Sequence, residues 1–219
     1  MVEVSASILS VKKEKAIQTL YNLETAKIDY FHIDAMDGKF VKNNTIDQML
    51  EYCECLNSIS NLPLDIHLMV EDVKNYFYSF LVFEPNIVTF HVEAAKSKEE
   101  VMEWIKLIKE NNVKVGISVK PNTPVEEVYE YLPYIHLVLV MTVEPGEGGQ
   151  KLIESTISKV QTLKDYIEKN NLEVDIEVDG GITTENVNTL KNAGANMIVS
   201  GSGILNSKDF KEIVKRLKK

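Results

Sequence analysis

Two short segments combine imidazole and carboxylate side chains in a pattern that suits metal binding. His32-Ile33-Asp34 and Asp65-Ile66-His67 each lie in an apolar, strand-like run, and Asp179 ends another such run. Residues two apart on a strand point to the same side, so His32 and Asp34 would face the same way. Two imidazoles and two carboxylates at strand ends predict one mixed nitrogen and oxygen site for a divalent metal. The predicted ligands are His32, Asp34, His67 and Asp179.

Opposed carboxylates at such a site could move a proton at carbon. One of Asp34 and Asp179 would remove a proton from one face of a carbon, and the other would return a proton to the opposite face. We expect these two aspartates to be the catalytic residues. Zinc is the expected metal, and iron, manganese and cobalt are alternatives with similar ligand preferences.

The other two histidines are interpreted differently. A lone buried histidine is more often a hydrogen-bonded core residue than a metal ligand, and only its combination with two carboxylates favours ligation by His32 or His67. His91 lies in a fourth strand-like run and is interpreted as packing beside the site or supporting a ligand. His136 begins a strand, at the wrong end for the site, and is interpreted as structural.

Strand-like and helix-like patterns alternate along the chain and predict eight strand–helix pairs. The expected strands cover residues 3–9, 30–34, 64–70, 86–92, 113–119, 136–143, 173–178 and 195–200. The expected helices cover residues 12–26, 46–56, 73–83, 98–111, 125–131, 152–169, 184–192 and 209–217. Near-continuous apolar runs are typical of strands buried on both faces of a parallel sheet. The pattern predicts an α/β fold, a single-domain (β/α)8 TIM barrel over residues 1–219, with an open doubly wound sheet as the alternative.

A barrel of this kind places its active site at the carboxyl ends of the strands. The four predicted ligands fall at such ends, and Ser7 lies near the end of the first strand. Met36, Met69 and Met141 also fall near strand ends. Methionines there could be core filler. Because all three methionines lie at the same depth in the predicted barrel, we favour an apolar, polarizable collar around the reacting carbon.

Three glycine-rich segments follow the last three expected strands. They are Gly146-Glu147-Gly148-Gly149, Gly180-Gly181 and Gly201-Ser202-Gly203. Loops after the seventh and eighth strands of a barrel often hold a phosphate through backbone N–H groups and a short helix. Ser202 is a candidate cap and phosphate ligand at such a helix. Because these segments contain no lysine or arginine, the phosphate would be held mainly by N–H dipoles; plain tight turns are the alternative.

Composition excludes several other classes of function. The net charge of −9 argues against a nucleic-acid surface, which needs a basic stripe. Cys53 and Cys55 are two apart in an expected helix, where they do not face each other, so a disulfide is not expected. No apolar run reaches membrane-spanning length, and the first residues lack a signal-peptide pattern. These features favour a cytoplasmic protein without a membrane or nucleic-acid partner.

Six segments together carry a resemblance to a known family over essentially the whole chain. They are Ser5–Ser10, His32–Val41, Asp65–Val70, Met141–Gln150, Val178–Ile182 and Val199–Ser202. In this order they resemble the signature motifs of pentulose-phosphate 3-epimerases, best known as ribulose-phosphate 3-epimerase. The resemblance implies an isomerase of the pentose phosphate pathway that interconverts D-ribulose 5-phosphate and D-xylulose 5-phosphate through an enediolate.

The resemblance also assigns roles to residues of this chain. It implies one divalent metal on the four ligands above, acid and base roles for Asp34 and Asp179, and no nucleotide cofactor. The residues expected to contact the sugar or its phosphate are Ser7, His67, Gly146, Glu147, Gly148, Gly149, Asp179, Gly180, Gly181, Gly201 and Ser202. A small phosphorylated ketose is the expected substrate, and a homo-oligomer is the expected assembly.

Two positions depart from the family pattern. Lys42 stands where the family usually has proline, and Glu147 stands where it usually has phenylalanine. A carboxylate near a phosphate dianion is unfavourable unless it points to solvent or pairs with a cation. Substrate identity therefore stays open. The alternatives are a D-allulose-6-phosphate 3-epimerase, a lyase of the hexulose-phosphate synthase type, and an inactive sugar-phosphate-binding protein.

Overall fold

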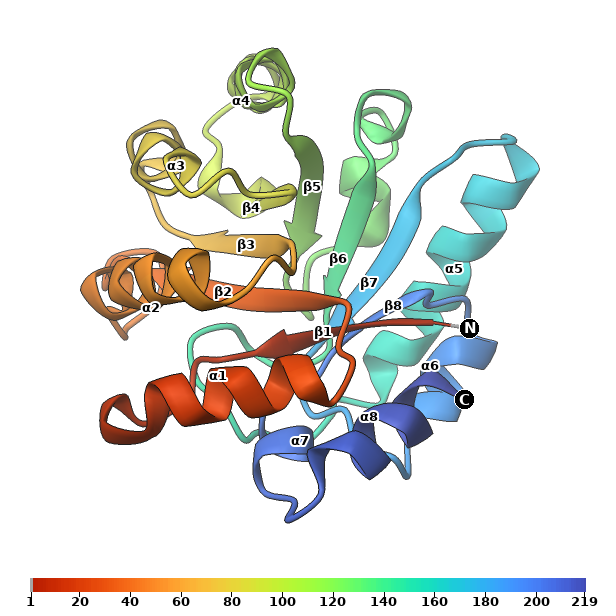
Figure 1. The fold of residues 1–219 in the computed structure, drawn as a ribbon. Coiled ribbons are helices and arrows are strands. Elements are labelled where there is room, and N and C mark those ends of the chain that lie inside the picture. Colours follow the sequence, from red (N-terminus) through yellow and green to blue (C-terminus); the bar gives the residue numbers. More distant parts are fainter. Residues whose placement is uncertain (1) are drawn as a thin grey trace.

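Eight parallel strands close into a barrel in the computed structural model, which describes residues 2–219 (Figure 1). The strands are β1 Glu3–Ser7, β2 Tyr30–Met36, β3 Leu64–Met69, β4 Ile87–His91, β5 Lys114–Val119, β6 Leu137–Met141, β7 Asp175–Asp179 and β8 Met197–Val199. Each strand pairs with the next along the chain, and β8 pairs with β1. The predicted TIM barrel is confirmed, and the open-sheet alternative is wrong because the sheet has no edge. Met1, the first residue of the predicted domain, lies outside the described residues.

Helices surround the barrel and cover its outer surface (Figure 1). They are α1 Ala16–Thr25, α2 Ile46–Ile59, α3 Val73–Leu81, α4 Lys98–Glu110, α5 Ser155–Lys169, α6 Val187–Asn192, α7 Ser202–Leu205 and α8 Phe210–Lys218. Short 3₁₀ helices are η1 Lys13–Lys15, η2 Val92–Ala94, η3 Val125–Val128 and η4 Leu132–Tyr134. Among residues 2–219, no helix has the length and hydropathy needed to cross a bilayer.

One expected helix does not form. The sequence pattern predicts a helix over 125–131, after β5, but only the 3₁₀ turn η3 forms there. Pro133 lies in the next 3₁₀ turn, η4, and has no N–H to donate to the carbonyl four residues earlier, so an α-helix that began at Val125 could not continue through it. The short helix expected at Ser202 forms as α7, whose four residues are too few for a helical period to mark its bounds in the sequence.

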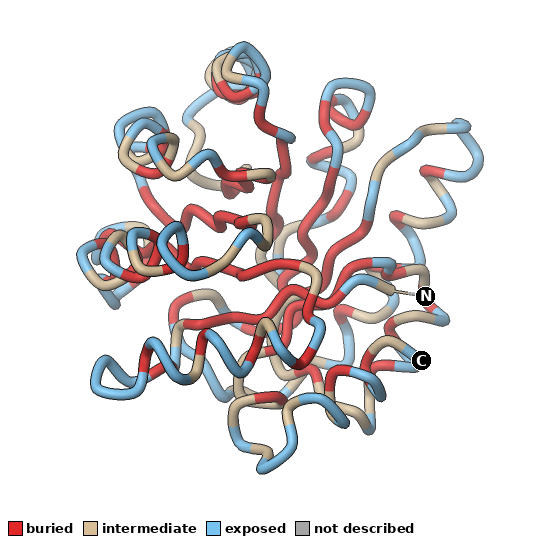
Figure 2. The backbone as a smooth tube through the Cα atoms, viewed as in Figure 1, coloured by how far each residue is buried: buried red, intermediate tan, exposed pale blue. Residues whose placement is uncertain are grey.

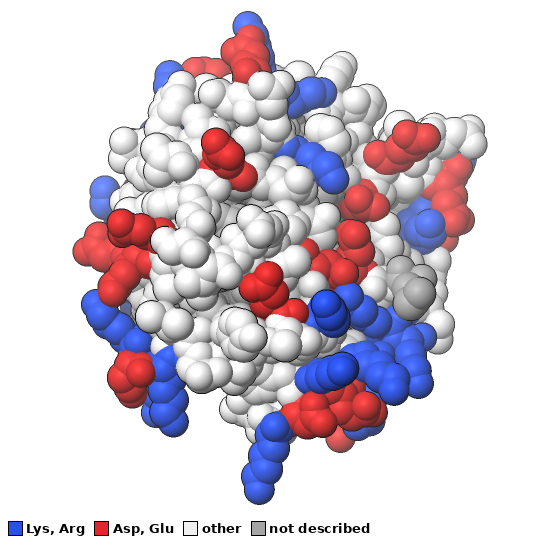
Figure 3. Space-filling view, viewed as in Figure 1, with Lys and Arg blue, Asp and Glu red and all other residues white. Residues whose placement is uncertain are grey.

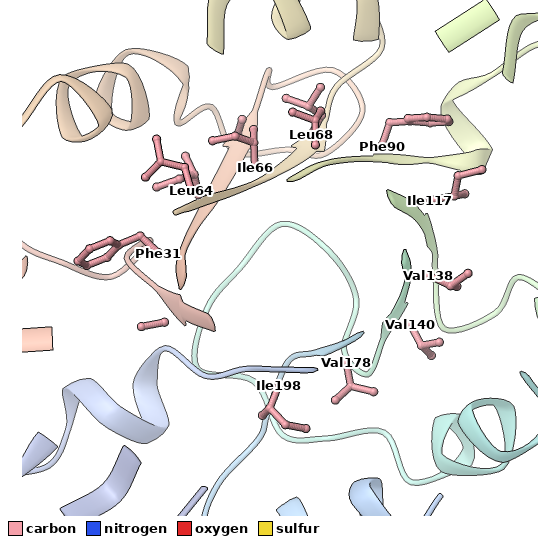
Figure 4. Close-up of a cluster of buried hydrophobic side chains, with 14 of the residues drawn as sticks. Phe31, Leu64, Ile66, Leu68, Phe90, Ile117, Val138, Val140, Val178 and Ile198 are labelled. Carbon is pink, nitrogen blue, oxygen red and sulfur yellow. The ribbon is translucent and has the colours of Figure 1, made fainter. Parts of the chain in front are cut away.

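Alternation along each strand separates two kinds of core. Side chains at one set of positions point away from the barrel toward the helices, as Figure 4 shows for Ile66, Leu68, Phe90 and Val140 among others. Side chains at the intervening positions point into the barrel. A second apolar cluster, which includes Leu137, fills part of the interior. Figure 2 shows that the strands are buried almost throughout, while the helices alternate buried and exposed turns.

The last helix, α8, lies beside the first strand, β1 (Figure 1). Lysines and arginine gather around α8 near the C-terminus in Figure 3, with acidic side chains beside them. Lys218 donates to the Asp29 carboxylate at 2.7 Å and to the Lys27 carbonyl at 2.6 Å. Basic residues in the last turn of a helix also complement its dipole. This basic tail therefore attaches the last helix to the barrel.

Candidate active site

Four side chains from three strands meet inside the carboxyl end of the barrel. Asp34 of β2 lies opposite His67 of β3 in the strand register, and both point inward. Asp34 Oδ1 lies 3.4 Å from His32 Nε2 and 3.5 Å from His67 Nδ1. Asp179 Oδ2 lies 3.8 Å from His32 Nε2 and 3.7 Å from His67 Nδ1. One donor atom from each of the four residues lies within 4.8 Å of the others, as the metal prediction requires.

The hydrogen bonding of this cluster fits a divalent cation. Among the described residues, His32 Nε2 and His67 Nδ1 are buried nitrogens with no hydrogen-bond partner, and both face the two carboxylates. The opposite nitrogen of each ring is engaged, since His32 Nδ1 lies 2.6 Å from Asp65 Oδ2 and His67 Nε2 lies 2.9 Å from His91 Nε2. Metal-binding histidines are typically held in this way through their second nitrogen. The cluster could therefore hold a metal ion.

A buried carboxylate network lies behind His32, and the sequence interpretation gave it no role. The Ser5 hydroxyl donates to Asp65 Oδ2 at 2.8 Å, and that same oxygen faces His32 Nδ1. Burial would lower the pKa of His32, but the charges of Asp65 and Asp34 raise it well above its usual value. Burial, and the Asp65 charge beside it, raise the pKa of Glu177 well above its usual value.

The two candidate acid and base residues have very different environments. Although burial favours the neutral form of Asp34, His32 and His67 hold the pKa of this carboxyl well below its usual range. Burial, together with the negative charge of Asp34, raises the pKa of Asp179 to about 7. A pair of carboxyls whose pKa values are driven apart can serve as a base and an acid at neutral pH.

His91 extends the cluster on the side of His67. Its ring lies 5.0 Å from the His67 ring between centroids, and its Nδ1 lies 3.1 Å from Glu93 Oε2. Burial lowers the pKa of His91 to about 4. Burial opposes ionisation of Glu93, but hydrogen bonds from His91, Thr123 and the Lys120 N–H lower its pKa to about 2. His91 thus contacts a predicted ligand, as one of its two interpretations held.

A narrow pocket opens above the four candidate ligands. Its walls include the predicted residues Ser7, Asp34, Met36, Met69, Met141, Gly146, Glu147, Gly148, Gly149, Asp179, Gly180, Gly181, Gly201 and Ser202. All three methionines thus border the same space. His32 and His67 are fully buried and lie outside the pocket lining, so the predicted sugar contact of His67 has no exposed atom to make it.

The glycine loops bring backbone close to the pocket. Gly180 and Gly181 have positive φ angles of 115° and 68°, which favour glycine. A Cβ at Gly181 would clash with the Leu152 nitrogen, so only glycine fits between β7 and the loop before α5. Ser202 is the first residue of α7 rather than its cap; Gly201 occupies the cap position. No lysine or arginine lines the pocket within the described chain, so an anion there would meet N–H groups.

Lys42 and Glu147 are both exposed and line a second hollow, and Glu147 also lines the pocket above the candidate ligands. The Asn43 amide donates to the Gly146 carbonyl at 2.8 Å and joins the loop after β2 to the loop after β6. Gln150 donates to the carbonyls of Glu144 and Glu147 at 2.7 Å and 2.9 Å and folds the second loop on itself. Glu147 is exposed to solvent, which is the first of the two alternatives under which a carboxylate is tolerated there.

Sequence reasoning missed Asp65, Glu177 and Glu93 as parts of the site. A partial signal existed, because Asp65 and Glu177 lie two residues before His67 and Asp179 and so share their inward face. A carboxylate at an inward position of an otherwise apolar strand needs a partner, and Asp65 finds His32 and Ser5 on other strands. Glu93 lies in η2, beyond the end of β4, where alternation no longer indicates a direction.

Sequence comparisons identify the family to which this chain is related. The model of the ribulose-phosphate 3 epimerase family matches residues 3–205. The chain is 36% identical over 219 residues to the ribulose-phosphate 3-epimerase of Bacillus subtilis strain 168, covering 100% of this chain and 99% of that protein. It is 36% identical over 218 residues to the ribulose-phosphate 3-epimerase of Methanocaldococcus jannaschii, covering 100% of this chain and 90% of that protein.

Solved structures with low sequence identity share the fold. KGPDC from Streptococcus mutans has a TM-score of 0.71 and 11% identity, covering 100% of this chain and 96% of that chain. The 3-hexulose-6-phosphate synthase from Salmonella typhimurium has a TM-score of 0.70 and 15% identity, covering 99% of this chain and 96% of that chain. At such low sequence identity, these similarities support only a shared barrel fold. On the family match and the full-length relatives, this chain belongs to the ribulose-phosphate 3 epimerase family and is an isomerase.

Proposed function

We propose that the chain interconverts D-ribulose 5-phosphate and D-xylulose 5-phosphate by proton transfer between C3 and two aspartates. Family membership supports the pentulose phosphates as substrates. The observation that carries the mechanism is the pair Asp34 and Asp179, two carboxyls that line one pocket in environments that separate their pKa values. We propose further that residues 1–219 act as one catalytic domain, in a homo-oligomer and in the cytoplasm.

Each aspartate acts on one face of the sugar. In one direction, one carboxylate takes the C3 proton and leaves an enediolate, and the other carboxyl delivers its proton to the opposite face of C3. The reverse reaction exchanges the two roles, since the reaction is reversible. General acid–base catalysis of this kind contributes about 10²–10⁴-fold. The Ser7 hydroxyl, 2.7 Å from Asp34 Oδ2, would keep that carboxylate oriented during the transfer.

His32, Asp34, His67 and Asp179 would hold one divalent cation, for which we propose zinc, with iron, manganese and cobalt as alternatives. Such a cation supplies Lewis-acid stabilisation of the negative charge that develops on the sugar oxygens. The two imidazoles would orient the site from below, since neither has surface exposed in the pocket. The two carboxylates line the pocket and would remain in reach of the substrate.

The rest of the pocket would hold the two ends of the substrate. Backbone N–H groups around Gly180–Gly181 and Gly201–Ser202 would bind the phosphate, and positive φ angles at the first pair of glycines support this orientation of backbone. Met36, Met69 and Met141 would form an apolar collar that keeps water from the enediolate. Loss of the intermediate to side reactions would thereby be reduced.

Proton NMR in D2O tests the proposal. Zinc-loaded protein is mixed with D-ribulose 5-phosphate, and deuterium at C3 and formation of D-xylulose 5-phosphate are followed together. The Asp179→Asn variant, shown to be folded by circular dichroism, is the matched control and should give neither signal. Exchange of the C3 proton for deuterium without formation of D-xylulose 5-phosphate would contradict proton delivery to the opposite face of C3.

The same assay separates the alternative functions. Turnover of D-allulose 6-phosphate but not of the pentulose phosphate would replace the substrate and keep the aspartates. Formaldehyde release from a hexulose phosphate would replace the reaction with carbon–carbon bond cleavage. Binding of the sugar phosphate without exchange in any of these mixtures would overturn catalysis altogether.

A further inference from the structure

A line of hydrogen bonds runs from His67 to the loop after β5. Glu93 Oε1 accepts from the Lys120 backbone N–H at 2.7 Å and also from the Thr123 hydroxyl. Its other oxygen, Oε2, lies 3.1 Å from His91 Nδ1. His91 Nε2 lies 2.9 Å from His67 Nε2. His67 and His91 are fully buried, and the Glu93 side chain is 20% exposed.

The direction of donation along this line follows from its far end. A carboxylate can only accept, so Glu93 must receive the hydrogen of His91 Nδ1. An uncharged imidazole has one N–H, and His91 Nε2 is therefore left as an acceptor. The only hydrogen it can accept from His67 is the one on Nε2. His67 Nδ1 then carries a lone pair, and it faces Asp34 Oδ1 at 3.5 Å and Asp179 Oδ2 at 3.7 Å.

We propose that His91 and Glu93 are positioning residues, whose hydrogen-bond relay holds His67 in the tautomer that presents the Nδ1 lone pair to the metal. This inference rests on the metal site of the proposed function. It adds two residues to that site, neither of which lines the pocket. Partners of this kind typically contribute about 10–100-fold to metal affinity or activity.

The far end of the relay is itself held in place. Lys159 of α5 donates to the carbonyls of Lys120, Pro121 and Thr123 at 2.8 Å, 2.8 Å and 2.6 Å. These bonds fix the loop that supplies both donors to Glu93. A glutamine at position 93 could keep its oxygen toward these donors only by turning its NH₂ group toward His91 Nδ1. His91 Nδ1 would then accept instead of donate. His91 Nε2 would consequently donate to His67 Nε2, the reverse of the direction proposed for the wild type.

Two pairs of variants of the full chain test the relay. Glu93→Gln preserves the shape of the side chain but reverses the donation. Glu127→Gln makes the same change on an exposed residue and is its control. His91→Gln keeps an acceptor and a donor about where the imidazole nitrogens were, whereas His91→Met offers no donor and only a weak acceptor. All variants are first compared by circular dichroism and thermal midpoint without metal.

The first readout is the zinc dissociation constant of metal-free protein, measured by competition with a chromogenic chelator. We expect Glu93→Gln and His91→Met to weaken zinc binding by about 10–100-fold. Glu127→Gln should match the wild type, and His91→Gln should lie closer to the wild type than His91→Met. Equal affinity in all five proteins would overturn the relay. Failure of the wild type itself to bind zinc would instead overturn the metal site of the proposed function.

The second readout uses neither activity nor metal. Correlation spectra of the histidine ring ¹⁵N nuclei in metal-free protein report which nitrogen of His67 carries the proton. We expect the proton on Nε2 in the wild type and His91→Gln, and on Nδ1 in Glu93→Gln. A proton that stays on Nε2 in Glu93→Gln would contradict the relay even if that variant binds zinc weakly.

Discussion

The Ser7 hydroxyl donates to Asp34 Oδ2 at 2.7 Å, and the other oxygen of the same carboxylate, Oδ1, is the one that faces both imidazoles. The two residues come from neighbouring strands, with Ser7 opposite His32 in the register. The hydroxyl therefore fixes the rotation of the carboxylate. Ser7 was predicted to contact the sugar; it lines the pocket and also orients a candidate ligand.

Replacing Ser7 by alanine should weaken catalysis without unfolding the barrel. Asp34 Oδ2 would lose its donor and the carboxylate could rotate away from the imidazoles. We expect kcat/KM to fall by about 10–100-fold, the usual effect of removing a group that orients a ligand. Steady-state kinetics check this, with Ser58→Ala on the exposed end of α2 as the control. Unchanged kinetics in Ser7→Ala would remove Ser7 from the site.

Asp179→Asn should abolish epimerisation. The amide can neither accept the C3 proton nor deliver one, so the loss should be at least about 10²–10⁴-fold in kcat. The circular dichroism spectrum should be unchanged, because Asp179 lies at the pocket surface rather than in the outer core. Turnover near the wild-type rate would exclude this residue as an acid or base.

Removal of metal should inactivate the enzyme. Chelation would leave two buried imidazole nitrogens without partners and the developing negative charge on the sugar without its cation. We expect activity to return when zinc, iron, manganese or cobalt is added back. The measurement is turnover together with metal content by elemental analysis. Full activity in a sample verified as metal-free would contradict metal assistance.

Zinc affinity should fall as the pH decreases through neutrality. The pKa of Asp179 is raised to about 7 in the metal-free fold, so below that pH the carboxyl carries a proton that must leave before a cation binds. One competing proton weakens binding about tenfold per pH unit below the pKa. The raised pKa of His32 adds a second competing proton. Chelator competition between about pH 5 and 8 checks the slope, and a pH-independent constant would contradict it.

Gly181→Ala should destabilise the fold and weaken substrate binding. Its φ is 68° and its Cβ would clash with the Leu152 nitrogen, so backbone must move. Strain of this kind costs about 1–3 kcal/mol, and we expect a lower free energy of unfolding and a higher KM. Gly149→Ala is the matched control for stability, because its φ of 76° is similar and no atom lies within 4 Å of its Cβ. Equal destabilisation by the two changes would show that contact with Leu152 is unimportant.

Much of the barrel and of the cluster follows from the sequence because both depend on local periodicity. Apolar runs alternating with helical segments identify parallel strands, and parallel strands bring their carboxyl ends together. Alternation then places His32 and Asp34 on one face of β2. The glycine pair at Gly180 is also a local signal, since a positive φ favours that residue.

Only the tertiary structure decided how these side chains are held. Whether Asp65 pairs with His32, and whether His91 and Glu93 reach His67, depends on the register between strands and on a loop from another part of the chain. Hydrogen-bond partners separated by many residues leave no periodic trace in a single sequence. The bounds of the short helix α7, with Ser202 as its first residue and Gly201 at the cap position, were decided in the same way, because so short a helix is stabilised by its packing on the barrel rather than by its own sequence pattern.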